Sequence, residues 1–585
     1  MSDKVDKKRK ERIKQLVSEG KIEEALTLAG MTDVDLLFEM GFFAWENEKH
    51  EIVERIFSQI LEYEPDNAAA WLNRGVALSN LSRYEEALTC YDEVLKQNFS
   101  TAETWYNKGI ALQELENHEE ALTCFDEVLK IDPGNADAWF SKGVALGNRG
   151  EHKKAITCFD KALKIDPDNA ATWYNKGLSL EFCERHDEAL HCFDEAIKRD
   201  SSYVDAWYKK GVALHNLERF DEALHCYDKA LEITPGDVRV WCNKGNALEY
   251  LGNHTEALTC YDTALKIDPR SAEAWHGKGV TLENTGEHTE AISCFENALK
   301  VNPDDAVAWH GKGRALESTG HGAEAVKCID TALKIDPDNA HTWADKGVAL
   351  QNLGKFNEAL TCFDTALKID PDHAYAWMNK GITLDCLGKY NQAMTCFDKA
   401  TKIDPHCATA WLTKGKVLGN QRKHKKALKY IDKALKIDPD DYDAWYSKGV
   451  ILARLKKYKK ALTCLDKALA MDPGNADAWA KKGIALAQVG NPDEALRSFD
   501  TSLKIDPGNA QTWFNKGIVF LLSENFKEAV PCFDKAVKIN PQNALAWFNK
   551  GMALGCLGKY KKATECIDKA EKLDPTLSKY GVRKK

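Results

Sequence analysis

Tryptophan recurs at a fixed interval of 34 residues through most of this chain of 585 residues. A glycine stands four residues after each of these tryptophans, and an alanine stands sixteen residues after each. A period of this length is typical of a solenoid, in which one short structural unit is repeated and stacked. The tryptophans that set the period are Trp71, Trp105, Trp139, Trp173, Trp207, Trp241, Trp275, Trp309, Trp343, Trp377, Trp411, Trp445, Trp479, Trp513 and Trp547.

The spacing of apolar residues predicts two α-helices in each repeat. Trp71, Gly75 and Leu78 stand at i, i+4 and i+7, which places them on one face of a helix. Ala87 and Tyr91 begin a second run with the same spacing. Because one helical hairpin cannot bury its apolar face alone, we expect successive hairpins to stack and share a continuous core.

Proline closes thirteen of the fifteen repeats, usually within a sequence of the type Ile-Asp-Pro-x-Asn, as in residues 131–135. Proline cannot continue a helix, and the following Asn or Asp can cap the next one. The ordered pattern of Trp, Gly, Ala, aromatic, Ala and Pro resembles the tetratricopeptide repeat family over residues 68–577. The resemblance implies an all-α fold, a right-handed superhelical solenoid of helix-turn-helix repeats.

One position departs from the family pattern in every repeat. The residue before the glycine is Arg74 in the first repeat and Lys in the other fourteen, where the family usually has Leu. A lysine stem can lie along apolar surface while its charge reaches water. We therefore expect a local adjustment and no change of fold.

The segments outside the array predict further helices. Residues 1–33 are expected to form an N-terminal helical hairpin, and residues 34–67 a degenerate repeat. The fifteen regular repeats fill residues 68–577, and residues 578–585 form a short basic tail. No solvating helix follows the last repeat, so we expect its apolar face to be partly open at the C-terminal end.

Composition excludes several classes of protein. Charged residues make up 29% and apolar residues 44%, which excludes a disordered or membrane-embedded chain. The net charge of −10 disfavours a general nucleic-acid binder, because phosphates select a basic surface. No apolar run approaches the length of a membrane span, and no secretory signal is recognisable. We predict a cytoplasmic protein.

The sequence contains no recognisable catalytic machinery. It has no glycine-rich phosphate loop, no GxSxG turn and no HExxH motif, and the repeats leave little room for a catalytic domain. We therefore predict no enzymatic activity, no cofactor and no small-molecule substrate.

Histidine recurs at the turn between the two helices of a repeat. One interpretation is a ladder of metal sites, and the other is a polar turn residue that alternates with aromatic residues such as Tyr84 and Phe220. We favour the second interpretation and predict no metal site. The histidines concerned are His118, His152, His186, His254 and His288.

Thirteen of the eighteen cysteines occupy one position, just before the aromatic position of the second helix. A disulfide needs Cα atoms within about 7 Å, whereas packed helices are about 8–10 Å apart. We therefore predict buried, unpaired thiols at Cys90, Cys124, Cys158, Cys192, Cys226, Cys260, Cys294, Cys328, Cys362, Cys396, Cys464, Cys532 and Cys566.

The family resemblance implies that ligands contact the first helix of each repeat, which lines a concave groove. The positions that share this side are −2, +1, +2, +5, +8 and +9 relative to the tryptophan. Position +2 is often Asn, whose amide can hold the backbone of an extended peptide, although Asn also simply suits a solvated helix. These residues are Asn73, Asn107, Asn175, Asn243, Asn379, Asn515 and Asn549.

Aromatic and acidic residues complete the predicted peptide-binding groove. Aromatic rings favour contact with a partner, and they stand at position +1 as Tyr106, Phe140, Tyr174, Tyr208, Tyr446, Phe514 and Phe548. Acidic residues in the middle repeats indicate a basic or mixed-charge ligand, and they stand at position +8 as Glu181, Glu249, Glu283 and Glu317.

A second candidate surface is basic. Residues 411–460 contain 15 Lys and Arg against 5 Asp. This cluster is either a ridge that docks an acidic surface or a solvated charged edge, and we favour the solvated edge. The ridge residues are Arg422, Lys423, Lys425, Lys426, Lys456, Lys457, Lys459 and Lys460.

Together these features predict a scaffold that binds protein or peptide segments in its groove. Two alternatives stay open. The first is an assembly protein that forms homo-oligomers through its C-terminal end, and the second is a regulatory or targeting subunit of a separate enzyme.

Overall fold

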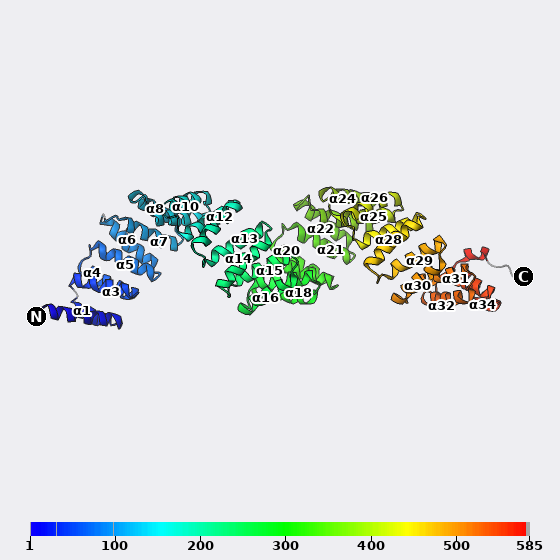
Figure 1. Ribbon diagram of the computed structural model, residues 1–585, viewed down its shortest axis with the longest axis horizontal. Helices are drawn as coiled ribbons and strands as arrows, with labels where there is room; N and C mark the ends of the chain where they lie inside the picture. Colours follow the sequence, from blue (N-terminus) through cyan, green and yellow to red (C-terminus); the bar gives the residue numbers. More distant parts are fainter. Residues whose placement is uncertain (1, 31, 98, 581–585) are drawn as a thin grey trace. The chain divides into compact units, whose positions relative to one another are not determined.

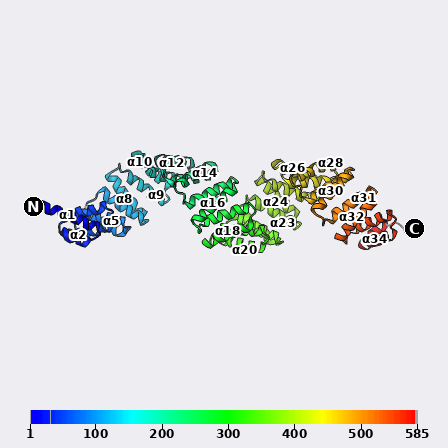
Figure 2. The ribbon, with the colours of Figure 1, turned by 60° about the horizontal axis from the view of Figure 1, so that its bottom comes forward.

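The structure is a computed structural model that describes residues 2–30, 32–97 and 99–580. Within these residues the chain forms 34 α-helices and one short 3-10 helix, and no strand. The predicted all-α stack of helical hairpins is confirmed. The chain divides into two compact blocks, Met1–Pro303 and Asp304–Lys585, and Figures 1 and 2 show the succession of hairpins within each block.

The first block contains nine helical hairpins, and its first two precede the regular array. The helices are α1 (Ser2–Ser18), α2 (Ile22–Ala29), α3 (Val34–Glu46), α4 (His50–Tyr63), α5 (Ala68–Asn80), α6 (Tyr84–Lys96), α7 (Ala102–Glu114), α8 (His118–Ile131), α9 (Ala136–Asn148), α10 (His152–Ile165), α11 (Ala170–Glu181), α12 (His186–Arg199), α13 (Val204–Asn216), α14 (Phe220–Ile233), α15 (Val238–Tyr250), α16 (His254–Ile267), α17 (Ala272–Asn284) and α18 (His288–Val301).

The second block continues the same pattern with eight hairpins and a terminal 3-10 helix. Its helices are α19 (Ala306–Ser318), α20 (Gly322–Ile335), α21 (Ala340–Asn352), α22 (Phe356–Ile369), α23 (Ala374–Cys386), α24 (Tyr390–Ile403), α25 (Ala408–Asn420), α26 (His424–Ile437), α27 (Tyr442–Arg454), α28 (Tyr458–Met471), α29 (Ala476–Val489), α30 (Pro492–Ile505), α31 (Ala510–Leu522), α32 (Phe526–Ile539), α33 (Ala544–Cys556), α34 (Tyr560–Leu573) and η1 (Pro575–Tyr580).

Each hairpin from α3 and α4 onward is closed by a glycine of its first helix that faces a large side chain of the second helix. A Cβ atom built on Gly143 would lie 2.6 Å from ring atom Cε1 of Phe159, which is too close for any real contact. The ring of Phe159 is itself 1% exposed, so it has no room to move away. The glycine therefore fixes how closely the two helices approach, and the aromatic ring fills the core between them.

The tryptophan anchors the start of each first helix to the turn before it. The indole Nε1 of Trp173 donates to the carbonyl oxygen of Pro167 at 2.9 Å, and the same bond recurs in most repeats. The adjacent Asn169 accepts a hydrogen bond from the backbone N–H of Thr172 and caps the helix, as the sequence predicted.

The lysine that departs from the family pattern forms an ion pair with the preceding hairpin. Lys278 Nζ lies 2.7 Å from Asp262 Oδ1 and 6.0 Å from the ring centre of Trp275. This explains how the charge is accommodated so close to the core, because the carboxylate and the indole face both stabilise it. The same lysine–aspartate pair is formed by Lys108, Lys142, Lys176, Lys210, Lys244, Lys346, Lys380, Lys414, Lys448, Lys482, Lys516 and Lys550.

The first helices of neighbouring hairpins lie closer together than the second helices do. Within each block the first helices contact each other directly, as in the pairs α5 and α7 or α21 and α23. The second helices instead pack mainly against first helices, as α6 does against α5 and α7. Each block therefore curves with its first helices on the inner side.

We expect a methyl group at Gly143 to destabilise its hairpin and one at Gly147 to leave it intact. Both glycines lie on α9, but a Cβ on Gly147 would have Ser179 Oγ, at 3.9 Å, as its nearest neighbour. Gly143→Ala should cost about 1–3 kcal/mol through overpacking, whereas Gly147→Ala should be neutral or stabilising by up to about 1 kcal/mol.

The measurement is hydrogen exchange of peptides from α9 and α10 in the full-length chain, which reports local opening. Faster exchange in the Gly143→Ala variant alone is the expected result. Equal exchange in both variants would show that the close glycine contact does not limit hairpin stability.

Candidate binding face on the first helices

The positions −2, +1, +2, +5, +8 and +9 of the first helices form the candidate site, which we call the first-helix face. At position +1 the seven predicted aromatic residues are all half-buried. Their rings lie against the aromatic ring of the second helix, with centroids 6.0 Å apart for Tyr106 and Phe125 and 6.1 Å apart for Tyr174 and Phe193. Phe140 and Tyr208 are placed in the same way. These rings are held rigidly by the core, with one side left toward the first-helix face.

The asparagines at position +2 are also half-buried, except Asn379, which is buried. In most of them the amide nitrogen donates to the backbone carbonyl four residues earlier, as Asn175 does to Ala171 at 2.8 Å. Asn73, Asn243, Asn379 and Asn549 form the same bond. Asn515 instead accepts from Gln511. The bond orients each amide and occupies one of its two N–H donors, so a ligand would meet a fixed group with donor and acceptor capacity left.

Side chains on the first-helix face also join successive repeats. Tyr106 Oη lies 3.3 Å from Ser141 Oγ, and Asn243 Nδ2 donates to Tyr208 Oη at 3.2 Å. In each case position +1 of one repeat meets position +2 of the next. The face is thus a connected polar and aromatic surface and not a set of separate side chains.

The acidic residues at position +8 form the second set of such links. Glu249 accepts from Asn284 Nδ2 at 2.8 Å and contacts His254 Nδ1 at 2.9 Å. Burial alone raises the pKa of Glu249, but these hydrogen bonds lower it below the ordinary value, so the side chain is ionised at neutral pH. Glu317 accepts from Asn352 in the same manner, and Glu283 is likewise half-buried.

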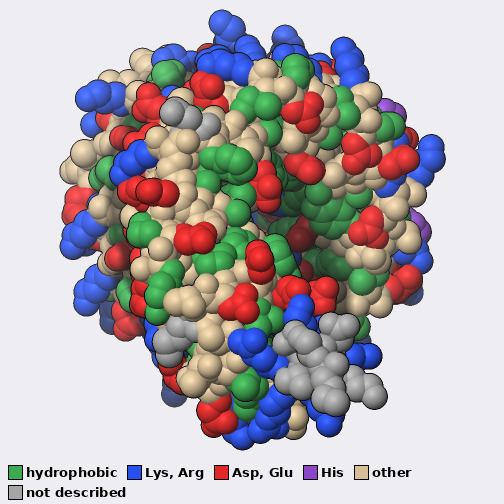
Figure 3. Space-filling view, turned by 90° about the vertical axis from the view of Figure 1, so that its left-hand side faces the viewer, with side chains coloured by type: hydrophobic (Ala, Val, Ile, Leu, Met, Phe, Trp, Pro, Cys, Tyr) green, Lys and Arg blue, Asp and Glu red, His purple; other side chains and the backbone are tan. Residues whose placement is uncertain are grey.

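Figure 3 shows the chain from its N-terminal end. Hydrophobic and acidic side chains gather toward the middle of the visible face, whereas lysine and arginine stand mainly around its outer edge.

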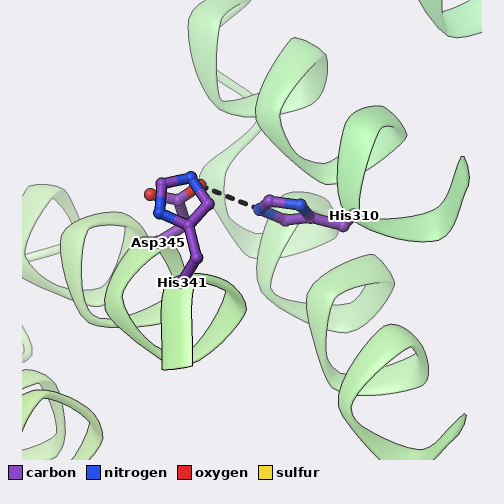
Figure 4. A group of neighbouring side chains, drawn as sticks. All are labelled: His310, His341 and Asp345. Atoms are coloured by element: carbon purple, nitrogen blue, oxygen red, sulfur yellow. Dashed lines mark hydrogen bonds and ion pairs between the residues drawn. The ribbon is translucent and has the colours of Figure 1, made fainter. Parts of the chain in front are cut away.

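The sequence analysis missed one cluster on the first-helix face. His310, at position +1 of α19, and His341 and Asp345, at positions −2 and +2 of α21, bring their ligating atoms within 4.8 Å of one another. His310 Nε2 lies 2.8 Å and His341 Nε2 3.6 Å from Asp345 Oδ2. Figure 4 shows the three side chains close together, with the contact between His310 and Asp345 marked. The signal that could have revealed the cluster is the i, i+4 spacing of His341 and Asp345 beside a histidine of the preceding repeat.

The turn histidines have other surroundings. His254 and His186 face the glutamates of the preceding helix, and His152 stacks on Phe182 with ring centres 4.4 Å apart. In the described part of the chain, the single group of three or more potential metal ligands contains none of the turn histidines.

The basic ridge is exposed at all eight of its positions. In other repeats the start of the second helix carries an i, i+3 ion pair, as between Arg219 Nε and Glu222 Oε1 at 2.7 Å. Lys423 and Lys426 occupy the equivalent two positions, so like charges replace the pair. Within the described residues none of the eight ridge side chains forms an ion pair. The ridge is therefore a region of uncompensated positive charge at helix N-termini.

The fold defines an α-helical repeat protein of the kind that supports protein–protein interactions. Models of the tetratricopeptide repeat match the chain at residues 68–100, 102–135, 136–169, 174–238, 238–271, 272–305, 306–339, 340–373, 374–407, 417–480, 452–514, 510–543 and 544–577. The chain belongs to the tetratricopeptide repeat family, as the sequence pattern predicted.

Several solved structures are similar to this chain. The anaphase-promoting-complex assembly Cut9–Hcn1 is 17% identical over 79% of this chain and 98% of that chain, with a TM-score of 0.41. Yeast Tom70 is 18% identical over 76% and 98%, with a TM-score of 0.36. YrrB, described as a TPR protein with an unusual peptide-binding site, is 30% identical over 32% and 95%, with a TM-score of 0.29. Comparison with curated proteins finds no match. Among the described residues, no helix has the length and apolar character needed to cross a membrane.

All eighteen cysteines are free, and the thirteen second-helix cysteines are all buried, as predicted. Burial raises the pKa of Cys90, Cys124 and Cys226 to about 11. Since the thiolate is the reactive form, only about a thousandth of such a thiol is ionised at pH 8. Cys386 and Cys556 are instead exposed.

We expect Cys386 and Cys556 to react first when the native chain meets a thiol reagent such as dithionitrobenzoate at pH 8. The double variant Cys386→Ser/Cys556→Ser should lack this fast phase, and denaturant should release the remaining thiols. A fast phase in the double variant that exceeds the two half-buried thiols Cys183 and Cys407 would contradict the burial of the thirteen second-helix cysteines.

Proposed function

We propose that this protein is a scaffold that binds extended segments of other proteins along the first-helix face. The observation that carries the proposal is the regular column of half-buried aromatic rings at position +1, flanked by oriented amides at position +2. Half-buried rings fixed by a core lose little freedom on binding, and this makes them good contact residues. The acidic side chains at position +8 favour segments that carry Lys or Arg.

The C-terminal end offers less support for self-assembly. The 3-10 helix η1 packs against α34 and buries Leu577, which is 7% exposed. Tyr560, the first residue of α34, is exposed, but no other large hydrophobic side chain of residues 560–578 is exposed. Stable dimers usually need an exposed hydrophobic patch. We therefore favour binding along the first-helix face over self-assembly through the C-terminal end.

Replacing the aromatic column should weaken binding. A library of unstructured peptides is displayed to the full-length chain, and bound peptides are measured by fluorescence anisotropy. The triple variant Tyr106→Ala/Phe140→Ala/Tyr174→Ala should lower affinity at least about tenfold, because each half-buried ring that contacts a ligand contributes on the order of 1 kcal/mol. Peptides enriched in Lys or Arg should lose affinity further as salt is raised.

Two control variants separate this face from other surfaces. Tyr390→Ala/Tyr560→Ala removes exposed rings at the start of second helices, and affinity should not change. Lys456→Glu/Lys457→Glu/Lys459→Glu/Lys460→Glu reverses part of the basic ridge. If the ridge variant loses binding while the triple aromatic variant keeps it, the first-helix face is not the binding site.

A further inference from the structure

We infer that His310, His341 and Asp345 form a binding site for a divalent transition-metal ion, with Zn²⁺ as the best-fitting ion. The site lies entirely within the second block, on the adjacent first helices α19 and α21. Two imidazoles and one carboxylate form a frequent protein ligand set for zinc. Three protein ligands leave one position of a tetrahedral ion for water or for a side chain of a partner.

The distances require only small side-chain movements. Ligands about 2.1 Å from a tetrahedral ion are about 3.4 Å apart. The separation of His341 Nε2 and Asp345 Oδ2 is 3.6 Å and already fits. His310 Nε2 and Asp345 Oδ2 are 2.8 Å apart and share a hydrogen bond. When the metal binds, the imidazole of His310 gives up its Nε2 proton. The hydrogen bond is then replaced by two coordinate bonds, one from His310 Nε2 and one from Asp345 Oδ2.

Neighbouring rings hold the exposed ligand in place. The ring of His341 stands edge-on to His310 and stacks on His373, with both ring centres 5.7 Å away. His373 accepts the backbone N–H of Ala376 through Nδ1 and thereby caps α23, which fixes its own ring. A side chain that is 55% exposed is thus aimed at the carboxylate instead of moving freely.

The surrounding charge selects among metals. The Arg314 guanidinium is near enough to act electrostatically on both His341 and Asp345. Its charge opposes a cation held by electrostatic attraction alone, which is how Mg²⁺ and Ca²⁺ bind. Imidazole forms strong coordinate bonds with Zn²⁺, Ni²⁺ and Cu²⁺. We therefore expect zinc to bind and magnesium not to bind.

The test is calorimetric titration of the chelator-treated full-length chain with Zn²⁺, repeated with Mg²⁺, in the presence of a non-thiol reductant. The wild-type chain should bind one equivalent of Zn²⁺. The variants His341→Asn and Asp345→Asn should each bind Zn²⁺ at least about tenfold more weakly. Titration with Co²⁺ should give the visible absorption of a four-coordinate ion in the wild type and not in His341→Asn or Asp345→Asn.

His276→Asn is the matched control, because His276 occupies position +1 of the preceding repeat and belongs to no cluster of metal ligands among the described residues. It should bind zinc as the wild type does. Circular dichroism checks that each variant keeps its helix content. Zinc binding that is unchanged in both His341→Asn and Asp345→Asn would overturn the site, since any remaining zinc would then be held elsewhere.

Discussion

The contact between the glycine of the first helix and the large side chain of the second helix is the constraint on which each hairpin depends. At Gly211 and Gly347 a single methyl group would lie 2.5 Å and 2.6 Å from the opposing ring. No larger residue fits unless the helices separate. Once the distance between the two helices is fixed, the directions of the remaining side chains on both helices are fixed as well. This determines which side chains lie on the first-helix face.

A second set of contacts transmits this geometry from one hairpin to the next. In most repeats the indole donates to the proline carbonyl before it, and the lysine beside the glycine pairs with the aspartate of the preceding second helix. Each exposed ion pair contributes little by itself, but the pairs recur with one spacing. The repeated framework thus leaves variation to positions +1, +2 and +8, where neighbouring repeats differ in charge and in aromatic content.

The fold could be predicted from the sequence because its determinants are local and repeated. Trp, Gly, Ala and Pro recur every 34 residues, and this period alone predicts both the helical hairpin and the stacking of successive hairpins. The lysine before the glycine, where the family usually has Leu, could be explained only in part from the sequence. The aspartate that pairs with it lies on the preceding hairpin. The bond from Asn175 to its own helix depends on a rotamer, which no periodicity indicates. The group of His310, His341 and Asp345 joins different positions of two repeats, so a search within one column could not find it.

The pattern of helix contacts has a mechanical consequence. Among the described residues, the main helix contacts join helices no more than two places apart along the chain, so the stiffness of a block comes from local contacts. Small rotations at the interfaces between successive hairpins add up along a block. The distance between equivalent positions of the first-helix face can therefore lengthen or shorten, with a small part of the change taken up at each repeat. A stack built in this way can follow the contour of a bound segment without breaking any single hairpin.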